Sequence, residues 1–224
     1  MAMLDLLIKN AEVFDGTGTP SKVMNVGVQD GKIVSVSCSE DLKAIVEIDG
    51  AGLCLAPGFI DAHTHSDTQL YQNFSRWDKL KQGVTTEVGG QCGWSPAPYP
   101  ADTAADFLEY LSTINDFPRY ATFREAMDAL DNVKMDCHQA TFVGHHAIRG
   151  SVVGMANRPA IPQEIDRMCD LTEEAMQSGA LEFSTGLVYA TGVYCTAGEL
   201  TAIANAPKAP ELVGMRISEY AAAK

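Results

Sequence analysis

The sequence lacks the features of a membrane-spanning, secreted or nucleic-acid-binding protein. Its apolar runs stay short of the ~18 residues that a membrane-spanning helix needs. No basic region precedes the first apolar run, which Asp5 interrupts, so no signal peptide is predicted. Only 16 Lys and Arg stand against 29 Asp and Glu, and the resulting net charge of −13 repels phosphate backbones. We therefore expect neither a membrane nor a nucleic acid as a partner.

The six cysteines form no CxxC pair, and a chain of 224 residues is too long for a disulfide-dependent scaffold. We therefore predict free thiols and a cytoplasmic location. Hydrophobic residues make up 46% of the chain and charged residues 20%, which is typical of globular proteins. The length allows one or two domains with a sizeable core.

Residues 1–57 have the pattern of short strands separated by turns, among them the tight-turn pair Asp30-Gly31. The expected strands are Met3–Lys9, Val23–Gln29, Lys32–Val36, Ala44–Ile48 and Leu53–Ala56. We predict that this region forms a small β-sandwich module.

Residues 58–224 alternate between strands and helices, which is typical of parallel βα units. The expected strands are Phe59–Ala62, Val84–Val88, Ala140–Val143, Leu181–Ser184 and Glu211–Ile217. The expected helices are Gln69–Gln82, Thr103–Asn115, Thr122–Asn132, Pro162–Ser178 and Ala197–Ala206. Pro162–Ser178 is the best marked, because a proline opens it, Gly179 follows it, and its apolar residues recur at helical spacing.

A His-x-His pair follows the first of these strands. Because strand side chains alternate, His63 and His65 should point to the same side, where two imidazoles could hold Zn²⁺. Asp61 and Asp67 lie two positions before and after the pair, so on a strand they should point to the same side as the histidines. Either could accept a hydrogen bond from a histidine ring. A bare His-x-His is more often part of a polar loop. Its place after an apolar strand in a βα chain favours a metal site.

Four stretches together resemble the N-acyl-D-amino-acid deacylases (D-aminoacylases) of the amidohydrolase superfamily. They are Ala56–Asp67 (APGFIDAHTHSD), Gln82–Gly93 (QGVTTEVGGQCG), Val143–His145 (VGH) and Gly179–Tyr189 (GALEFSTGLVY). The resemblance runs from the amino terminus to about Tyr194 and implies a (β/α)₈ TIM-type barrel with a small β domain. For residues 58–224 it implies about the first four to five strands of that barrel.

The resemblance also implies a zinc site and a substrate-binding residue. His63 and His65 match the first two metal ligands of the family, and Cys92 matches its cysteine ligand. A thiolate is a soft ligand that suits zinc. Without the resemblance, a buried loop cysteine would be the favoured interpretation of Cys92. Tyr189 matches a substrate-binding tyrosine of the family, but a purely packing role at a loop edge is an equally good interpretation. His145 and His146 are expected to be structural hydrogen-bonding residues and are left out of the site.

Two departures from the family pattern stand out. Residues 58–224 number 167, whereas a complete barrel typically needs ~250. In the family the fifth strand ends in a histidine ligand, and here Gly214 stands in its place. The catalytic aspartate of the family would lie beyond Lys224, so no catalytic residue is assigned. We expect a truncated chain whose exposed barrel edges allow self-association.

The resemblance implies a metal-dependent hydrolase of the amide bond in small N-acyl-D-amino-acid substrates. In such enzymes zinc activates water and polarises the carbonyl, while a carboxylate passes a proton to the leaving amine. Two alternatives stay open: an inactive fragment with a partial metal site, and a cyclic-amide hydrolase of the dihydropyrimidinase type. Cys92, which stands where that second type has a lysine, argues against it.

Overall fold

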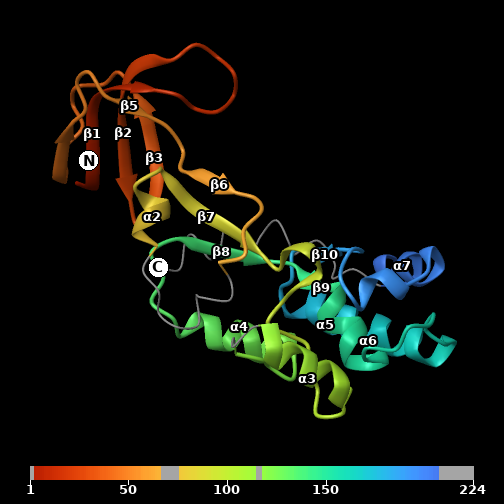
Figure 1. The fold of residues 1–224 in the computed structure, drawn as a ribbon. Helices are drawn as coiled ribbons and strands as arrows, with labels where there is room; N and C mark the ends of the chain where they lie inside the picture. Colours follow the sequence, from red (N-terminus) through yellow and green to blue (C-terminus); the bar gives the residue numbers. More distant parts are fainter. Residues whose placement is uncertain (1–2, 67–75, 115–117, 207–224) are drawn as a thin grey trace. The chain divides into compact units, whose positions relative to one another are not determined.

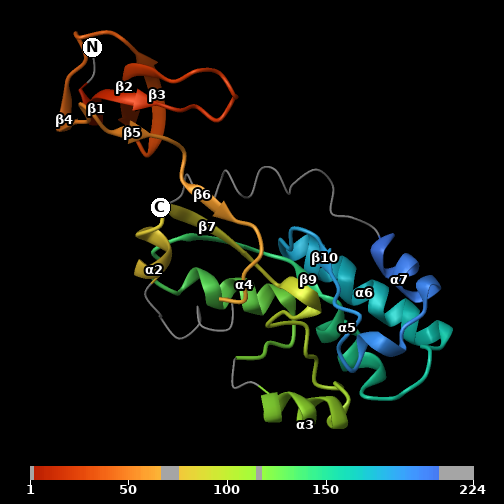
Figure 2. The ribbon, with the colours of Figure 1, turned by 45° about the horizontal axis from the view of Figure 1, so that its top comes forward.

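The structure, a computed structural model, describes residues 3–66, 76–114 and 118–206. It divides into two compact units, the first ending at Gly58 and the second beginning at Phe59. Figures 1 and 2 show the first unit as the strands β1–β5 and the second as the elements from β6 onward.

The first unit contains one five-stranded sheet. Its order is β3-β2-β1-β4, with β5 also pairing to β1, antiparallel within β1–β3 and parallel where β4 and β5 meet β1. The strands are β1 Leu4–Val13, β2 Lys22–Gln29, β3 Lys32–Ser37, β4 Ala44–Asp49 and β5 Cys54–Leu55. Asp30 and Gly31 both have positive φ, 51° and 70°, as a tight hairpin turn requires. All five expected strands are confirmed, and within the described residues they lie in one sheet.

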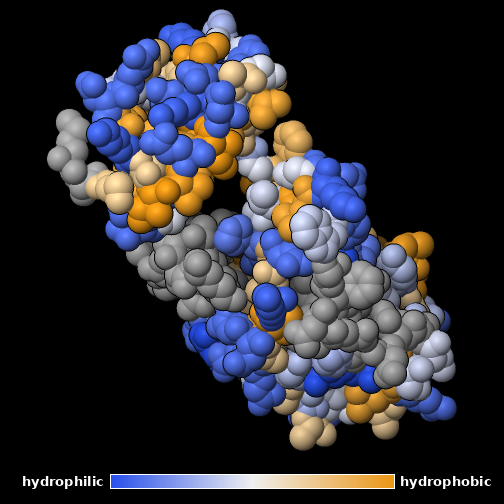
Figure 3. Space-filling model, turned by 90° about the vertical axis from the view of Figure 1, so that its left-hand side faces the viewer, coloured by the Kyte–Doolittle hydropathy of each residue, from blue (hydrophilic) through white to orange (hydrophobic). Residues whose placement is uncertain are grey.

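Few side chains of this sheet are covered. Leu7, Ala11 and Val26 form its buried centre. Other apolar side chains reach solvent, as Figure 3 shows on the surface of this unit. They include Val23, Ile33, Val34, Ile45 and Val46. The described part of the unit thus leaves apolar surface on its single sheet.

Three parallel strands open the second unit. β6 (Phe59–Asp61) pairs with β7 (Val84–Gly89), which pairs with β8 (His138–Thr141). The expected helix Gln69–Gln82 appears in the described residues only as the short α2 (Trp77–Leu80), and residues 69–75 lie outside them. The expected strand Glu211–Ile217 also lies outside them. A parallel sheet with helices between its strands is the arrangement that the sequence predicted.

The expected strand Ala140–Val143 is divided between two sheets, which corrects the prediction of a single strand. Phe142 N–H donates to Gly89 O at 3.1 Å, whereas Val143 N–H donates to Glu182 O at 2.9 Å. The chain therefore leaves the first sheet and joins a second, in which β9 (Val143–Gly144) runs parallel to β10 (Phe183–Ser184). The hydrogen bonds of neighbouring strands, and not the local sequence, set this break.

Helices gather beside β9 and β10, as Figures 1 and 2 show for α5, α6 and α7. The helices are α3 Ala105–Ile114, α4 Phe123–Asp131, α5 His145–Val153, α6 Pro162–Ser178 and α7 Ala197–Ala204. α6 has the predicted bounds, and its C-cap Gly179 has φ 110°. α5 was not predicted, because nearly every residue in it is buried and no polar face marks its period.

One hydrophobic core joins these helices to the second sheet. Its fully buried members include Phe123 of α4, Ile148 of α5, Met168 of α6 and Ile203 of α7. Within the described ranges, no helix is long and apolar enough to cross a membrane.

Candidate metal centre

His63 and His65 lie in the extended segment that continues β6. β6 itself ends at Asp61, so the two histidines follow the strand and do not belong to it. Thr64 N–H still donates to Val88 O at 3.2 Å, which keeps the segment beside β7. Thr64 is buried while both histidines are exposed, so the alternation of a strand persists and both imidazoles point to one side.

Cys92 lies in the tight turn η1 (Gln91–Gly93) that follows β7. Gly90, Cys92 and Gly93 all have positive φ, 69°, 56° and 84°. A Cβ on Gly90 would lie 2.1 Å from Phe142 O, so only glycine fits there. Non-glycine residues rarely adopt such a conformation, and it often marks a functional turn.

Two polar side chains, the buried Gln91 and the partly buried Ser184, hold this turn in place. The Gln91 amide donates to Ala62 O at 2.9 Å and to Val88 O at 3.2 Å, so it ties the turn to the chain just before His63. Ser184 Oγ accepts from Gly93 N–H at 3.0 Å and donates to Gly90 O. The turn is therefore fixed to β6 on one side and to β10 on the other.

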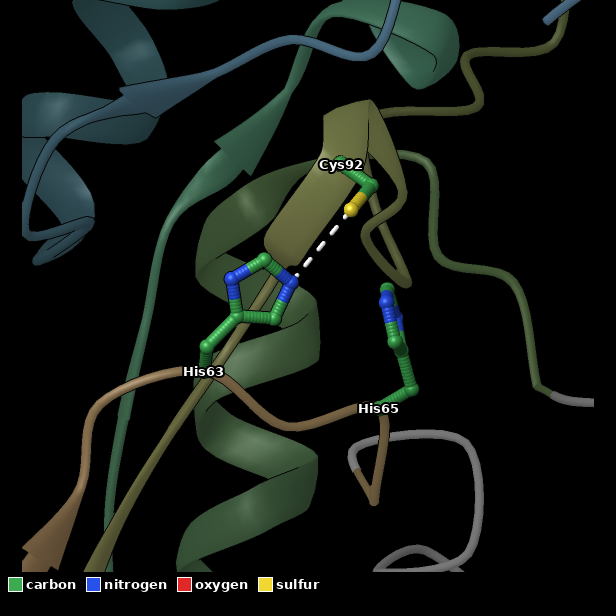
Figure 4. Close-up of side chains that lie close together, drawn as sticks. All are labelled: His63, His65 and Cys92. Atoms are coloured by element: carbon green, nitrogen blue, oxygen red, sulfur yellow. Dashed lines mark hydrogen bonds between the residues drawn. The ribbon is translucent and has the colours of Figure 1, made fainter.

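The ligand atoms of His63, His65 and Cys92 converge. All three lie within 4.8 Å of one another, and Cys92 Sγ is 3.4 Å from His63 Nε2. Figure 4 shows both imidazole rings directed toward the thiol. Zn–S and Zn–N bonds of ~2.3 and ~2.0 Å at a tetrahedral angle imply an S···N separation of about 3.5 Å. The donor set and its spacing therefore fit Zn²⁺.

Asp61 is engaged elsewhere and does not accept from a histidine ring. Its carboxylate accepts the His63 backbone N–H at 3.3 Å and forms an ion pair with Lys79. The hydrogen bond from Lys79 lowers the pKa of Asp61, and the same contact raises the pKa of Lys79. The role predicted for Asp61 as a partner of a ring is therefore wrong, and Asp67 lies outside the described residues.

Tyr189 packs beside the cysteine turn. Its ring centroid lies 5.1 Å from that of His146 and 5.5 Å from that of Trp94, the residue after the turn. A Cβ on Gly186 would lie 2.4 Å from Cys92 O and 2.9 Å from the Tyr189 ring, so glycine lets the two approach. Tyr189 is 36% exposed, which leaves its ring accessible to a ligand.

His146 is a structural residue. Its Nε2–H donates to Gly186 O at 3.0 Å, and its Nδ1 accepts from the Thr191 hydroxyl. Burial lowers its pKa to about 4. The neutral ring thereby fixes the segment that carries Tyr189 against α5.

His145, Cys195 and Glu199 form a second group whose ligand atoms lie within 4.8 Å of one another. Glu199 Oε1 accepts from Arg149 Nε at 2.7 Å, and both side chains are fully buried. Burial opposes ionisation of Glu199, but His145 and Arg149 together lower its pKa. A buried guanidinium repels a dication, so we interpret this group as an ion pair that joins α5 to α7.

Sequence reasoning missed the polar residues that support the first group. They are the buried Gln91 and Glu87, together with the partly buried Ser184. The signal for Glu87 was present, because an acidic residue inside the β-branched strand Val84–Val88 breaks the pattern of a buried strand.

The sequence profile described as "Amidohydrolase family" matches residues 46–217, most of the chain. The chain belongs to the amidohydrolase family. The resemblance to N-acyl-D-amino-acid deacylases is confirmed as well, because this amidohydrolase chain is 37% identical to the D-aminoacylase of Alcaligenes xylosoxydans xylosoxydans over 196 residues. That match covers 88% of this chain and 40% of the relative.

Solved structures give the same result. A D-aminoacylase studied for its binuclear metal centre, with one-metal activation and second-metal attenuation, superposes with a TM-score of 0.80 at 33% identity. The N-acyl-D-glutamate deacylase of Bordetella bronchiseptica, complexed with zinc and a phosphonate inhibitor, superposes at 0.79 and 33%. Each comparison covers 90% of this amidohydrolase chain and 42% of the other chain. The chain thus spans about two fifths of the length of these relatives.

Proposed function

We propose that this amidohydrolase chain forms part of a zinc-dependent enzyme that hydrolyses the amide bond of N-acyl-D-amino acids. The observation that carries the proposal is the convergence of His63, His65 and Cys92, whose ligand atoms lie within 4.8 Å of one another. Relatives named as deacylases of N-acyl-D-aspartate and N-acyl-D-glutamate, 37% and 34% identical, support the substrate class.

The two imidazoles and the thiolate would hold the ion. When bound, zinc supplies Lewis-acid chemistry, since it lowers the pKa of a water to near neutrality and polarises a carbonyl. A reducing cytoplasm would keep the Cys92 thiol available. The Tyr189 ring, 36% exposed beside the turn, would contact the substrate.

The proposal includes the architecture around the site. We infer that the sheet of residues 1–57 belongs to a small β-sandwich module and that residues 58–224 are a partial (β/α)₈ barrel. The strand order β6-β7-β8, parallel and in sequence order, supports the barrel. Apolar side chains at the β6 edge, Phe59 at 63% and Ile60 at 65% exposed, support self-association through that edge.

Zinc binding by the purified chain tests the site. Titration with a chromophoric zinc chelator as competitor should give one tight zinc per chain. In Cys92→Ser the affinity should fall at least tenfold, while Cys169→Ser, a change on α6, should match the unaltered chain. Equal affinity in all three proteins would reject the metal centre.

Hydrolysis is tested separately. The zinc-loaded chain is incubated with N-acetyl-D-amino acids, their L-enantiomers and hydantoins, and the released amine is measured. D-selective release supports the proposed activity, and ring opening of hydantoins supports the cyclic-amide alternative. No turnover by folded, zinc-loaded chain would mean that the chain is an inactive fragment with a partial metal site.

A further inference from the structure

Glu87 has more hydrogen-bond and ion-pair partners than Asp61, the other described carboxylate beside the candidate metal centre. It is 0% exposed, in the middle of β7. Its Oε1 accepts from Arg76 Nη2 at 3.1 Å and from Ser66 Oγ at 3.1 Å. Its Oε2 accepts from Gln139 Nε2 at 2.8 Å, and Lys79 Nζ lies 3.5 Å from Oε1. A buried carboxylate with partners on three sides is costly to retain for packing alone.

The register of the sheet places these groups level with one another. Asp61 of β6 pairs with Glu87, and Glu87 pairs with Gln139 of β8. In parallel neighbours, residues at one level point to the same face. One polar row therefore crosses all three strands of this sheet, just before the segment that carries the histidines.

This row reaches both ends of the His63–His65 segment. Directly after the segment, the Ser66 hydroxyl donates to Glu87, and the Ser66 N–H donates to Thr64 Oγ1 at 3.3 Å. Before the segment, the Lys79 ammonium contacts both Glu87 and Asp61. The Asp61 carboxylate in turn accepts the His63 backbone N–H. Glu87 is the one residue that both connections share.

Glu87 also contacts both cations of this region. Arg76 and Lys79 bring two positive charges into a poorly solvated region, and Glu87 and Asp61 offset them. Asp78 adds only a longer, exposed contact of 3.6 Å to Arg76. Asp136 Oδ2 also accepts the Arg76 backbone N–H at 3.0 Å. Loss of Glu87 would remove the acidic side chain that contacts both Arg76 and Lys79, so their positive charges would be less fully compensated close to two ligands of a dication.

We propose that Glu87 is a positioning residue of the metal centre, which holds the His63–His65 segment at both of its ends. The expected effect on zinc affinity rests on the proposed zinc site. The positioning itself is argued from the hydrogen bonds and ion pairs around Glu87. Residues that hold metal ligands in place typically change metal affinity by about 10–100-fold when they are replaced.

Glu87→Gln tests the proposal, because it removes the charge at nearly constant volume. Glu199→Gln is the matched control: Glu199 is also a buried glutamate paired with an arginine, but it joins α5 to α7. Zinc affinity should fall about 10–100-fold in Glu87→Gln and stay within about twofold of the unaltered chain in Glu199→Gln. Equal affinities in the two variants, at comparable thermal stability, would overturn the proposal.

Hydrogen–deuterium exchange of the metal-free chain separates this proposal from the zinc site itself. Glu87→Gln should speed exchange at the His63 and Thr64 amides, and Glu199→Gln should not. Faster exchange in a chain that binds no zinc would reject the metal centre but support the role of Glu87 in holding the His63–His65 segment. Unchanged exchange at these amides would show that Glu87 does not hold this segment.

Two milder variants keep the test decisive if Glu87→Gln fails to fold. Ser66→Ala removes the direct connection and Lys79→Met removes the bridged one. Each should weaken zinc binding several-fold and speed exchange at the His63 and Thr64 amides. If both variants bind zinc and exchange like the unaltered chain, Glu87 does not position the ligands.

Discussion

Cys92 Sγ lies 3.4 Å from His63 Nε2, although 29 positions separate the two residues in the sequence. The parallel pairing of β6 with β7 brings their following segments to the same edge of the sheet. Because the carboxyl ends of parallel strands meet at one edge, ligands from consecutive βα units can converge there. This single contact defines the candidate metal centre, and the first prediction follows from it.

Zinc should protect Cys92 from alkylation. A coordinated thiolate is not free to attack iodoacetamide, so labelling of Cys92 should slow at least tenfold in the presence of equimolar zinc. Cys38 and Cys54, which are exposed in the first unit, serve as internal controls and should label at the same rate with and without metal. Peptide mass spectrometry measures all three. Undiminished labelling of Cys92 would contradict its role as a ligand.

Gly90→Ala should destabilise the second unit by about 2–4 kcal/mol, the sum of left-handed strain and overpacking. Its φ is 69°, and a Cβ would lie 2.1 Å from Phe142 O, a backbone atom that cannot turn away. In the control Gly83→Ala, φ is 81° but the nearest atom is a side-chain carbon of the exposed Phe59, 3.2 Å away. Urea unfolding should show a loss of only about 1 kcal/mol for Gly83→Ala; equal losses would mean that the contact with Phe142 O is unimportant.

Glu199→Gln should lower the free energy of unfolding by about 3–5 kcal/mol, because it leaves the Arg149 guanidinium buried without its counter-charge. Glu164→Gln breaks a partly exposed pair with Arg158, at 2.7 Å, and should cost about 0–1 kcal/mol. Thermal and urea unfolding of both variants measure the difference. Losses of the same size would show that burial does not distinguish the two ion pairs.

Because of His146, the free energy of unfolding should decrease as the pH is lowered below neutrality. Its pKa is about 4 in the folded chain and about 6.5 when unfolded, so between these values only the unfolded state binds the proton. Stability from this residue is therefore complete above pH 6.5 and is lost as the pH falls toward 4, by about 3 kcal/mol in total. The buried neighbours His145 and Arg149 act in the same direction, since their positive charges oppose protonation.

The measurement is urea unfolding at a series of pH values from 7 to 4.5. His146→Gln removes the titrating ring, so its stability should fall less steeply than that of the unaltered chain over this window. Parallel slopes for the two proteins would show that His146 is not the titrating group.

The sequence by itself determined most of the secondary structure and the residue types of the candidate site. Apolar spacing, Pro162 and Gly179 predicted α6 to the residue, because these signals act within one element. The donor types of His63, His65 and Cys92, together with the motifs around them, indicated zinc and the amidohydrolase family. Ligand chemistry belongs to the residue types, so it can be read without coordinates.

Only the tertiary structure decided which polar groups hold the site. The break at Phe142 between two sheets, the engagement of Asp61 with Lys79 and the row centred on Glu87 all depend on strand register. Register is set by pairing between segments far apart in the chain, and local sequence patterns carry no record of it. The three candidate ligands that converge could therefore be predicted, whereas the polar groups around them could not.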